Sequence, residues 1–310
     1  MDDLRPRRER GPRPSRLGGP RVTPEERAGL TRHRTVASGE VDLAVWDSGP
    51  LGAPTIIAVH GYPDTHRLWD PVVRALPPSL RVVAYDVRGA GGSSAPAQRE
   101  GYAVDRLVDD LVAVLDATID GRGRAHLLGH DWGSVQLWTA VQREQVDARL
   151  TGRLASFTSI SGPGLDQLGA FLRSGRRPGQ LPAVLGQLVR SSYVGLFCLP
   201  VLPAVVMGAV AGRTGSNGIN LYRATIAGGG RSSVGHSPLA RTRVPVQLVV
   251  ATGDPFLRPE VFADTTRWAE DLERVDVAAG HWSPRTHPEL IAALVADFVG
   301  RTEPPPRPVS

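Results

Sequence analysis

The segment GHDWGS, residues 129–134, carries a carboxylate at the centre of a glycine-flanked turn. Gly129 and Gly133 lie two residues before and two residues after Asp131. This spacing is typical of a sharp strand-to-helix turn that lifts a nucleophile clear of a sheet, because larger flanking side chains would collide there. Serine is the usual nucleophile of such turns and attacks carbonyl carbon. A carboxylate forms an alkyl ester when it attacks saturated carbon, so Asp131 predicts the opening of an epoxide or of a carbon–halogen bond.

An acid and a base follow this nucleophile in an order that catalytic triads use. Asp254 ends PVQLVVATGD, residues 245–254, in which we predict a strand. His281 ends RVDVAAGH, residues 274–281, in which we predict the next strand. Because catalytic groups converge where strands end, we predict that Asp254 orients His281. His281 then activates the water that opens the ester on Asp131.

A turn nearer the start of the chain is a candidate source of oxyanion donors. HGYPD, residues 60–64, follows a predicted strand, and a tight turn there would aim the backbone N–H of Tyr62 at a developing oxyanion. The backbone N–H of Trp132 is the second candidate donor. His60 and His130 lie beside glycines at strand ends, where we expect structural hydrogen bonds.

Strand-like and helix-like segments alternate from about residue 34, which predicts an α/β fold with a mostly parallel, doubly wound sheet. Apolar residues at helical spacing predict helices over residues 104–118 and 287–300, the second of which we expect Gly300 to end. Short β-branched runs predict further strands in TIIAVHG, RVVAYDVRG, RAHLLGH and LASFTSISG, at residues 55–61, 81–89, 124–130 and 154–162.

Residues 162–240 interrupt this alternation and predict a helical cap, inserted over the edge of the sheet where open α/β sheets bind ligands. Within the cap, residues 191–212 contain no charged side chain, so a membrane span must be considered. Pro200 and Pro203 break this run. We therefore interpret it as two short apolar helices that line a lipophilic pocket.

Composition narrows the class of protein further. The 310 residues carry a net charge of +5, and all 36 basic residues are arginines, scattered among acids. This pattern lacks the basic aromatic surface of a nucleic-acid-binding protein. The single cysteine excludes an internal disulfide. We therefore expect a cytoplasmic monomer or homodimer that has no nucleic-acid partner.

The start of the chain is rich in Arg and Pro and poor in apolar residues, which predicts a disordered basic tail. It lacks the apolar region of a secretory signal. Its charge allows a weak peripheral contact with an anionic membrane surface. The predicted organisation is a tail over residues 1–30, a core over 31–161, the cap over 162–240, the rest of the core over 241–302 and a flexible tail over 303–310.

Four segments together resemble the epoxide hydrolases of the α/β-hydrolase superfamily. They are HGYPD, DVRGAGGSS, GHDWGS and AGHWSPRTHPEL, at residues 60–64, 86–94, 129–134 and 279–290. The resemblance covers about residues 34–300 and looks closest to the hydrolase part of actinobacterial enzymes in which such a domain is fused to a short-chain dehydrogenase. It implies an α/β-hydrolase fold and the conversion of an epoxide to a vicinal diol with no cofactor and no metal. The NAD chemistry of the fused relatives is not implied.

The resemblance also assigns two cap tyrosines. Epoxide hydrolases protonate the epoxide oxygen with two tyrosine hydroxyls, one in an S-x-Y…F…P segment and one just before an arginine. Tyr193 in SSYVGLFCLP and Tyr222 in NLYRATI match these positions. Ser192 stands where the first motif often has Trp, a departure that changes the expected shape of the pocket. In DVRGAGGSS, we expect Asp86 and Arg88 to pair beneath the site.

Two other functions stay open at this point. A haloalkane dehalogenase shares the Asp nucleophile and needs N–H donors that bind the halide. Trp132 could supply one of these donors, but the cap sequence contains no tryptophan that would supply a second. An inactive hydrolase-fold protein that binds or carries lipid would not need nucleophile, acid and base together. The uncharged run in the cap favours a lipophilic substrate such as a fatty-acid, terpenoid or aryl epoxide.

Overall fold

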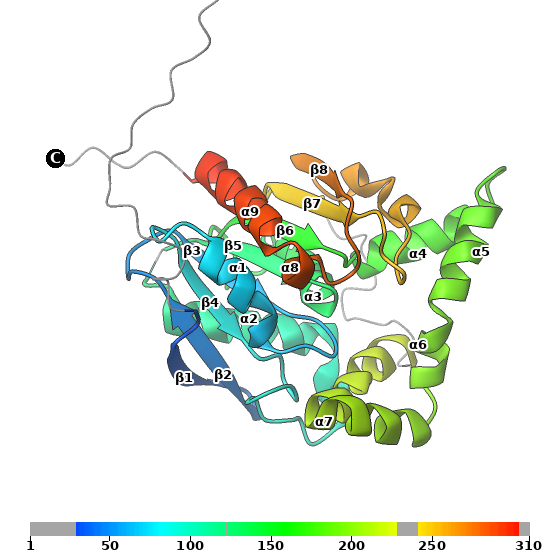
Figure 1. Cartoon of the computed structure of the whole chain (residues 1–310), viewed down its shortest axis with the longest axis horizontal. Helices are drawn as coiled ribbons and strands as arrows, with labels where there is room; N and C mark the ends of the chain where they lie inside the picture. The colour runs from blue at the N-terminus through cyan, green and yellow to red at the C-terminus, as the bar shows by residue number, and fades with distance from the viewer. Residues whose placement is uncertain (1–28, 122, 228–240, 304–310) are drawn as a thin grey trace, which may run out of the picture.

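An eight-stranded sheet forms the centre of the protein, with its strands in the order β1-β2-β4-β3-β5-β6-β7-β8 (Figure 1). The structure is a computed structural model, and it describes residues 29–121, 123–227 and 241–303. Nearly all of the two predicted tails lies outside the described residues. The strands are β1 (Arg32–Ser38), β2 (Val41–Ser48), β3 (Thr55–Val59), β4 (Arg81–Tyr85), β5 (Ala125–His130), β6 (Leu154–Ile160), β7 (Val246–Ala251) and β8 (Leu272–Val277).

The sheet is parallel except at one edge. β1 pairs antiparallel with β2, and β2 pairs antiparallel with β4. All the remaining pairs, from β4 through β3 to β8, are parallel. Every residue of β3, β4, β5, β6 and β7 is buried, as strands covered on both faces must be. The predicted α/β class with a mostly parallel, doubly wound sheet is confirmed.

Helices cover both faces of this sheet. On one face, α1 and α9 bury apolar side chains such as Ile291 in a core shared with β3 and β4. On the other face, α2 and α3 bury side chains such as Leu111 and Trp138. In α2 and α9 the buried apolar side chains recur at helical spacing, so each of these helices presents one apolar stripe to the sheet, whereas α3 is buried on nearly all sides. The core helices are α1 (Asp70–Ala75), α2 (Val104–Thr118), α3 (Trp132–Arg143), α8 (Ser283–Thr286) and α9 (Pro288–Thr302).

A second group of helices connects β6 to β7, within the segment for which we predicted a cap. Figure 1 shows this group at the right and lower right, beyond one end of the strands. α7 is kinked at Ala211 and Gly212, where Gly212 has a φ of 57°. Residues 228–240 of the predicted cap lie outside the described residues. The elements are α4 (Leu165–Ser174), α5 (Leu181–Arg190), α6 (Ser192–Phe197), α7 (Leu202–Tyr222) and a π-helical turn, η4 (Arg223–Ala227).

The uncharged run of the cap is divided between α6 and α7. Pro200 lies between these helices, and Pro203 lies in the first turn of α7, where a proline is tolerated because no intrahelical partner exists for its nitrogen. Among the helices of the described ranges, none combines the length and the apolar character needed to span a bilayer.

Two expectations from the sequence are wrong. Asp86 and Arg88 do not pair: Asp86 accepts the backbone N–H of His66 over 2.7 Å, whereas Arg88 donates to the buried Asp110 of α2 over 2.6 and 2.7 Å. The partners lie far along the chain, so the short segment alone could not reveal them. Gly300 also does not end the last helix, because α9 continues to Thr302.

Candidate active site

Asp131 lies at the turn between β5 and α3, in a backbone conformation that few L-residues adopt. Its φ is 52° and its ψ is −122°. Such strain persists where the surroundings fix it, and it clusters at functional sites. A Cβ at Gly133 would lie 2.0 Å from the carbonyl oxygen of Val59, and a Cβ at Gly129 would lie 2.8 Å from Cα of Ser134. The close packing around the turn therefore requires glycine at both flanking positions.

The structure places His281 between Asp131 and Asp254. Nδ1 of His281 lies 2.8 Å from Oδ2 of Asp254, and its Nε2 lies 3.7 Å from Oδ2 of Asp131. The backbone N–H groups of Phe256 and Leu257 donate to Oδ1 of Asp254 over 2.8 and 3.1 Å and fix that carboxylate. Asp254 accepts a hydrogen bond from the N–H at Nδ1, so the unprotonated nitrogen of a neutral His281 ring is Nε2. Nε2 faces Asp131 and can act as a base there.

Two backbone N–H groups bind the nucleophile itself. The N–H of Tyr62 donates to Oδ1 of Asp131 over 2.8 Å, and the N–H of Trp132 also donates to this carboxylate. The turn that carries Tyr62 is held by His60, whose Nε2 accepts the backbone N–H of Val87 over 2.9 Å. Oδ1 thus accepts the N–H of Tyr62, while Oδ2 faces His281.

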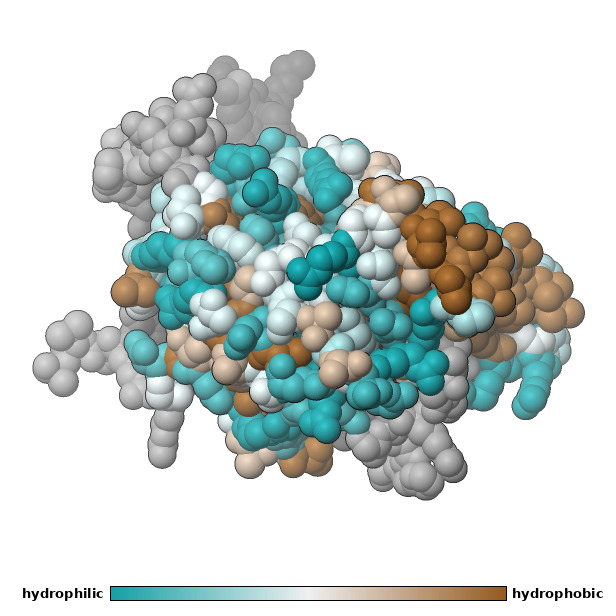
Figure 2. Space-filling model, turned by 90° about the horizontal axis from the view of Figure 1, so that it is seen from below, coloured by the Kyte–Doolittle hydropathy of each residue, from teal (hydrophilic) through white to brown (hydrophobic). Residues whose placement is uncertain are grey.

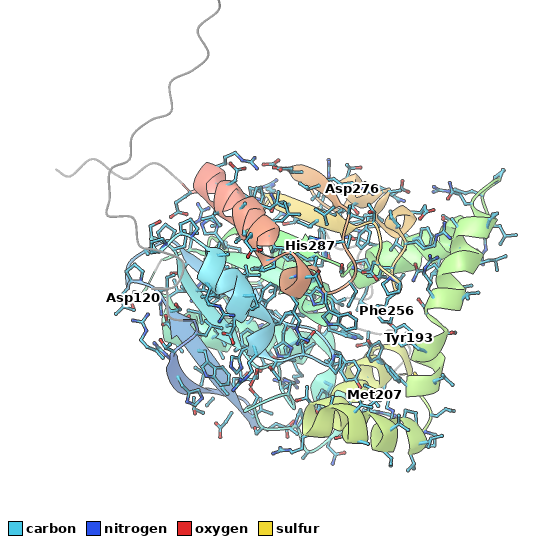
Figure 3. All side chains as sticks on the ribbon, in the orientation of Figure 1. Asp120, Tyr193, Met207, Phe256, Asp276 and His287 are labelled. Atoms are coloured by element: carbon cyan, nitrogen blue, oxygen red, sulfur yellow. The ribbon has the colours of Figure 1, made fainter. Side chains whose placement is uncertain are left out.

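A cavity of about 280 Å³ lies beside these groups. Figure 3 shows Phe256, Tyr193 and Met207 close together in the space between the cap helices and the core. The predicted residues that line the cavity are Tyr62, Asp131, Tyr193, Tyr222 and His281. Pro63, Phe197, Met207, Phe256 and Trp282 complete its wall. Asp254 and Trp132 do not line the cavity. Asp254 is hydrogen-bonded to His281, and the backbone N–H of Trp132 donates to Asp131.

The two predicted cap tyrosines contact each other through their hydroxyls. Tyr193 and Tyr222 share a hydrogen bond, and the side chain of Trp132 is hydrogen-bonded to Tyr222. Burial and the charge of Asp131 raise the pKa of both phenols well above the usual range of tyrosine. Both hydroxyls therefore carry their protons at neutral pH and can donate them to an oxygen in the cavity.

Burial and the contacts among Asp131, Asp254 and His281 determine the pKa values of these three side chains. Burial raises the pKa of the Asp131 carboxyl to about 6, although the charge of His281 and the two N–H donors act against it. Burial acts in the same direction on Asp254, but the hydrogen bond and charge of His281 and the two backbone N–H donors together hold the pKa of Asp254 below its ordinary value. Burial opposes the protonation of His281, but the hydrogen bond to Asp254 and the charges of both aspartates raise its pKa. Asp254 therefore stays ionised while Asp131 is a comparatively basic carboxylate.

Sequence reasoning missed the apolar wall of the cavity and one buried carboxylate behind it. Phe256 and Trp282 lie in the loops that carry Asp254 and His281, so aromatic residues next to the predicted triad were the available signal. Asp64, the last residue of HGYPD, accepts a hydrogen bond from Nε1 of Trp282 over 3.0 Å. Its charge raises the pKa of both Asp131 and His281.

Within residues 29–121, 123–227 and 241–303, no group of three or more His, Cys, Asp or Glu side chains could hold a metal ion. The expectation that the reaction needs neither metal nor cofactor stays a prediction.

Comparison with known sequences identifies relatives of this chain. A family model with the description alpha/beta hydrolase fold matches residues 54–189. The chain is 35% identical over 286 residues to "Probable oxidoreductase EphD" of Mycobacterium tuberculosis, which covers 83% of this chain and 48% of that protein. The chain thus spans about half the length of that curated relative. It is 29% identical over 346 residues to "Epoxide hydrolase A" of the same organism, which covers 87% of this chain and 98% of that protein.

Solved structures share the fold over most of the chain. A structure described as "Novel epoxide hydrolases belonging to the alpha/beta hydrolases superfamily in metagenomes from hot environments" has a TM-score of 0.70 at 24% identity, and the match covers 86% of this chain and 98% of that one. The Bacillus megaterium epoxide hydrolase in complex with an inhibitor has a TM-score of 0.68 at 20% identity, covering 86% and 100%. At 24% and 20% identity, this similarity shows a shared fold only.

Proposed function

We propose that the chain is an epoxide hydrolase of the α/β-hydrolase superfamily that converts a lipophilic epoxide and water into a vicinal diol. One observation carries this proposal: an aspartate occupies the nucleophile position of the turn, and two protonated phenols line the same cavity. A carboxylate can attack saturated carbon, and the phenols can protonate an oxygen that would otherwise leave as an alkoxide.

In the first step, Oδ2 of Asp131 attacks one carbon of the epoxide, since Oδ1 already accepts the backbone N–H of Tyr62. The bond between this carbon and the ring oxygen breaks as the bond to Oδ2 forms. The ring oxygen takes a proton from Tyr193 or Tyr222, which leaves a hydroxyl on the substrate and a phenolate in the cap. The product of this step is an alkyl ester of Asp131.

In the second step, Nε2 of His281 takes a proton from water, and the hydroxide attacks Cγ of Asp131. Oδ1 becomes the oxyanion of the tetrahedral intermediate; the N–H of Tyr62 already donates to this oxygen, and the N–H of Trp132 donates to the same carboxylate. The bond between Cγ and the alkylated oxygen then breaks, and the leaving alkoxide takes the proton from His281. The proton of the regenerated carboxyl returns to the phenolate, so the diol leaves and the site is restored.

Formation of the ester prepares His281 for its role. In the free enzyme, the charges of Asp131 and Asp254 both raise the pKa of His281. Alkylation removes the charge of Asp131, so one of these two contributions disappears when the ester forms. His281 therefore becomes easier to deprotonate in the intermediate, where a neutral base is required.

The structure offers less support for a haloalkane dehalogenase. Such an enzyme needs indole or backbone N–H donors that face the halide. The Trp132 side chain is hydrogen-bonded to Tyr222, and the indole N–H of Trp282 donates to Asp64. Both tryptophans near the cavity thus already have protein partners. An inactive lipid-binding protein is disfavoured by the arrangement of Asp131, His281 and Asp254.

A panel of epoxides and alkyl halides tests the proposal directly. Most of the cavity wall consists of aromatic and aliphatic side chains, including Phe197, Met207 and Phe256, so we expect turnover of aryl and long-chain alkyl epoxides to diols. Matched bromides and chlorides should release no halide above the rate without enzyme. Halide release without diol formation would reassign the chain to the dehalogenases, and no turnover of any compound would contradict both enzyme functions.

The rate of alkylation should depend on pH through Asp131. Its pKa is raised to about 6, and only the carboxylate attacks, so the single-turnover rate of ester formation should fall about tenfold per pH unit below that value. The variant Asp64→Asn removes a charge that raises the pKa of Asp131, so its profile should shift to lower pH. A rate of ester formation that is constant down to about pH 4 would contradict the raised pKa of Asp131, because an aspartate with an ordinary pKa would behave in that way.

A further inference from the structure

The outer face of the cap is unusually apolar. Figure 2 shows hydrophobic residues gathered over one end of the molecule. Within the described part of the chain, Leu51, Val146 and Leu290 are the only exposed large apolar side chains outside the cap. The exposed leucines and valines of α5 extend the patch. We define the cap face by six residues of α6, α7 and their connection, which are 48–74% exposed: Leu196, Leu199, Val201, Leu202, Val205 and Val210.

The charges around the cap face have one sign. From residue 167 to residue 253 the sequence contains no Asp and no Glu. Arg190, at the end of α5, and Arg213, in α7, are both exposed. Two carboxylates of the core lie near the end of the cap formed by α4 and α5. Asp264 lies 3.9 Å from Arg177, and the charge of Arg190 helps to lower the pKa of Glu260. The region around α6 and α7 therefore combines a large apolar area with positive charge.

The helices that carry the cap face also form the wall of the cavity. In α6, Leu196 is exposed while its neighbour Phe197 lines the cavity. In α7, Val205 is exposed while Met207, two residues on and on the other side of the helix, lines the cavity. A surface that bound the cap face would thus lie one helix thickness away from the cavity.

We propose that the cap face docks on the surface of an anionic lipid bilayer. Apolar side chains that enter the interface and arginines that bind lipid phosphates are the two features by which helices lie on membranes. This proposal goes beyond the reaction proposed above and does not depend on it.

Charge favours the bilayer over a second copy of the chain. Two copies that met through this face would bring arginines together with no carboxylate from α6 or α7 to compensate them. The chain segments outside the described residues are rich in Arg, Gly, Ser and Pro, and neither residues 1–28 nor residues 228–240 contain an apolar stripe that could cover the face. Anionic phosphates would complement both the apolar area and its basic surroundings.

Cosedimentation of the full chain with lipid vesicles tests this proposal. We expect binding to vesicles of phosphatidylcholine that contain about one third phosphatidylglycerol. On vesicles of phosphatidylcholine alone, the affinity should be about fivefold lower for each arginine that no longer meets an anionic headgroup. Binding to anionic vesicles should fall as salt is added, because salt screens the attraction. Equal binding to both kinds of vesicle, or no binding to either, would overturn the proposal.

A matched pair of triple variants locates the binding surface. L196S/L202S/V205S removes two leucines and one valine from the cap face, and we expect about tenfold or more weaker binding. L51S/V146S/L290S removes the same residue types from exposed positions outside the cap and should bind as the wild type does.

Equal binding by both variants would assign the contact to another surface, such as the basic N-terminal segment. A cap variant that loses self-association but keeps vesicle binding would identify the face as a contact between copies. Either result would overturn the proposal.

The single cysteine provides a second measurement on an otherwise unchanged chain. Cys198 is half-buried and lies in the connection between α6 and α7, next to Leu199 of the cap face. An environment-sensitive fluorophore on Cys198 should shift its emission to the blue when anionic vesicles are added. Sedimentation with vesicles but without this shift would mean that the cap face does not meet the bilayer.

Discussion

Replacement of Asp131 by alanine is expected to abolish diol formation. The proposed ester cannot form without this carboxylate, and loss of a covalent nucleophile reduces kcat by roughly 10⁴-fold or more. The strained turn itself should persist, because Gly129 and Gly133 keep the backbone approach that the turn requires. Steady-state diol formation together with circular dichroism of the variant measures both effects.

His281→Gln should separate the two steps. Asp131 keeps its donors from Tyr62 and Trp132 in this variant, so it should still attack the epoxide. Without a base facing the ester, hydrolysis should stall, and mass spectrometry should find the protein heavier by the mass of the substrate. Asp131→Ala is the matched control, which should form no such adduct. Diol formation by His281→Gln at the wild-type rate would exclude His281 as the base.

The source of the oxygen distinguishes covalent catalysis from direct attack by water. With enzyme in excess and a single turnover in ¹⁸O water, the label should enter the carboxylate of Asp131 and be absent from the first diol formed. This follows because hydroxide attacks Cγ of Asp131, while the substrate carbon receives Oδ2. Label in the diol of the first turnover would contradict the ester intermediate.

The parts of the fold and site that could be predicted are those whose signal is local. The turn at Asp131 is encoded by two glycines at fixed offsets, and the buried parallel strands are short β-branched runs that end in glycine. The predicted helix over residues 104–118 has the same bounds as α2, because its apolar spacing is regular. The grouping of Asp131, Asp254 and His281 required one further rule, that parallel strands end at the same edge of the sheet.

The parts that could not be predicted depend on contacts between distant segments. β1 and β2 pair antiparallel at one edge of the sheet. Most residues of β1 are exposed and most of these are polar, so its pattern is weaker than that of a buried strand. Arg88 finds its partner 22 residues away, in α2. The exposure of Leu196 and Val205 could not be predicted either, because an uncharged run in the sequence does not distinguish side chains that face a cavity from side chains that face solvent.

Removal of the two cap hydroxyls is the second test with a large expected effect, because the tyrosines distinguish epoxide opening from dehalogenation. Tyr193→Phe and Tyr222→Phe should each slow ring opening by roughly 10²–10³-fold in kcat, by analogy with the loss of one oxyanion donor. The double variant should form no measurable ester with epoxide. Because only an oxygen atom is removed each time, the melting temperature should change little.

Tyr85→Phe is the matched control for these variants. Tyr85 is buried in the core, where its hydroxyl donates to Gln136 over 3.3 Å, and it does not line the cavity. This variant loses a buried phenol without losing a proton donor in the site, so its rate of ring opening should stay close to that of the wild type.

The two cap variants should also behave differently from a dehalogenase. Halide leaves without a proton, so a dehalogenase would keep most of its halide-releasing rate after either substitution, whereas an epoxide oxygen that cannot be protonated must leave as an alkoxide. Stopped-flow measurement of ester formation with an epoxide substrate makes this comparison directly. If the double variant opened epoxides at near the wild-type rate, Tyr193 and Tyr222 would be packing residues of the cap. Another donor in the cavity would then have to protonate the ring oxygen.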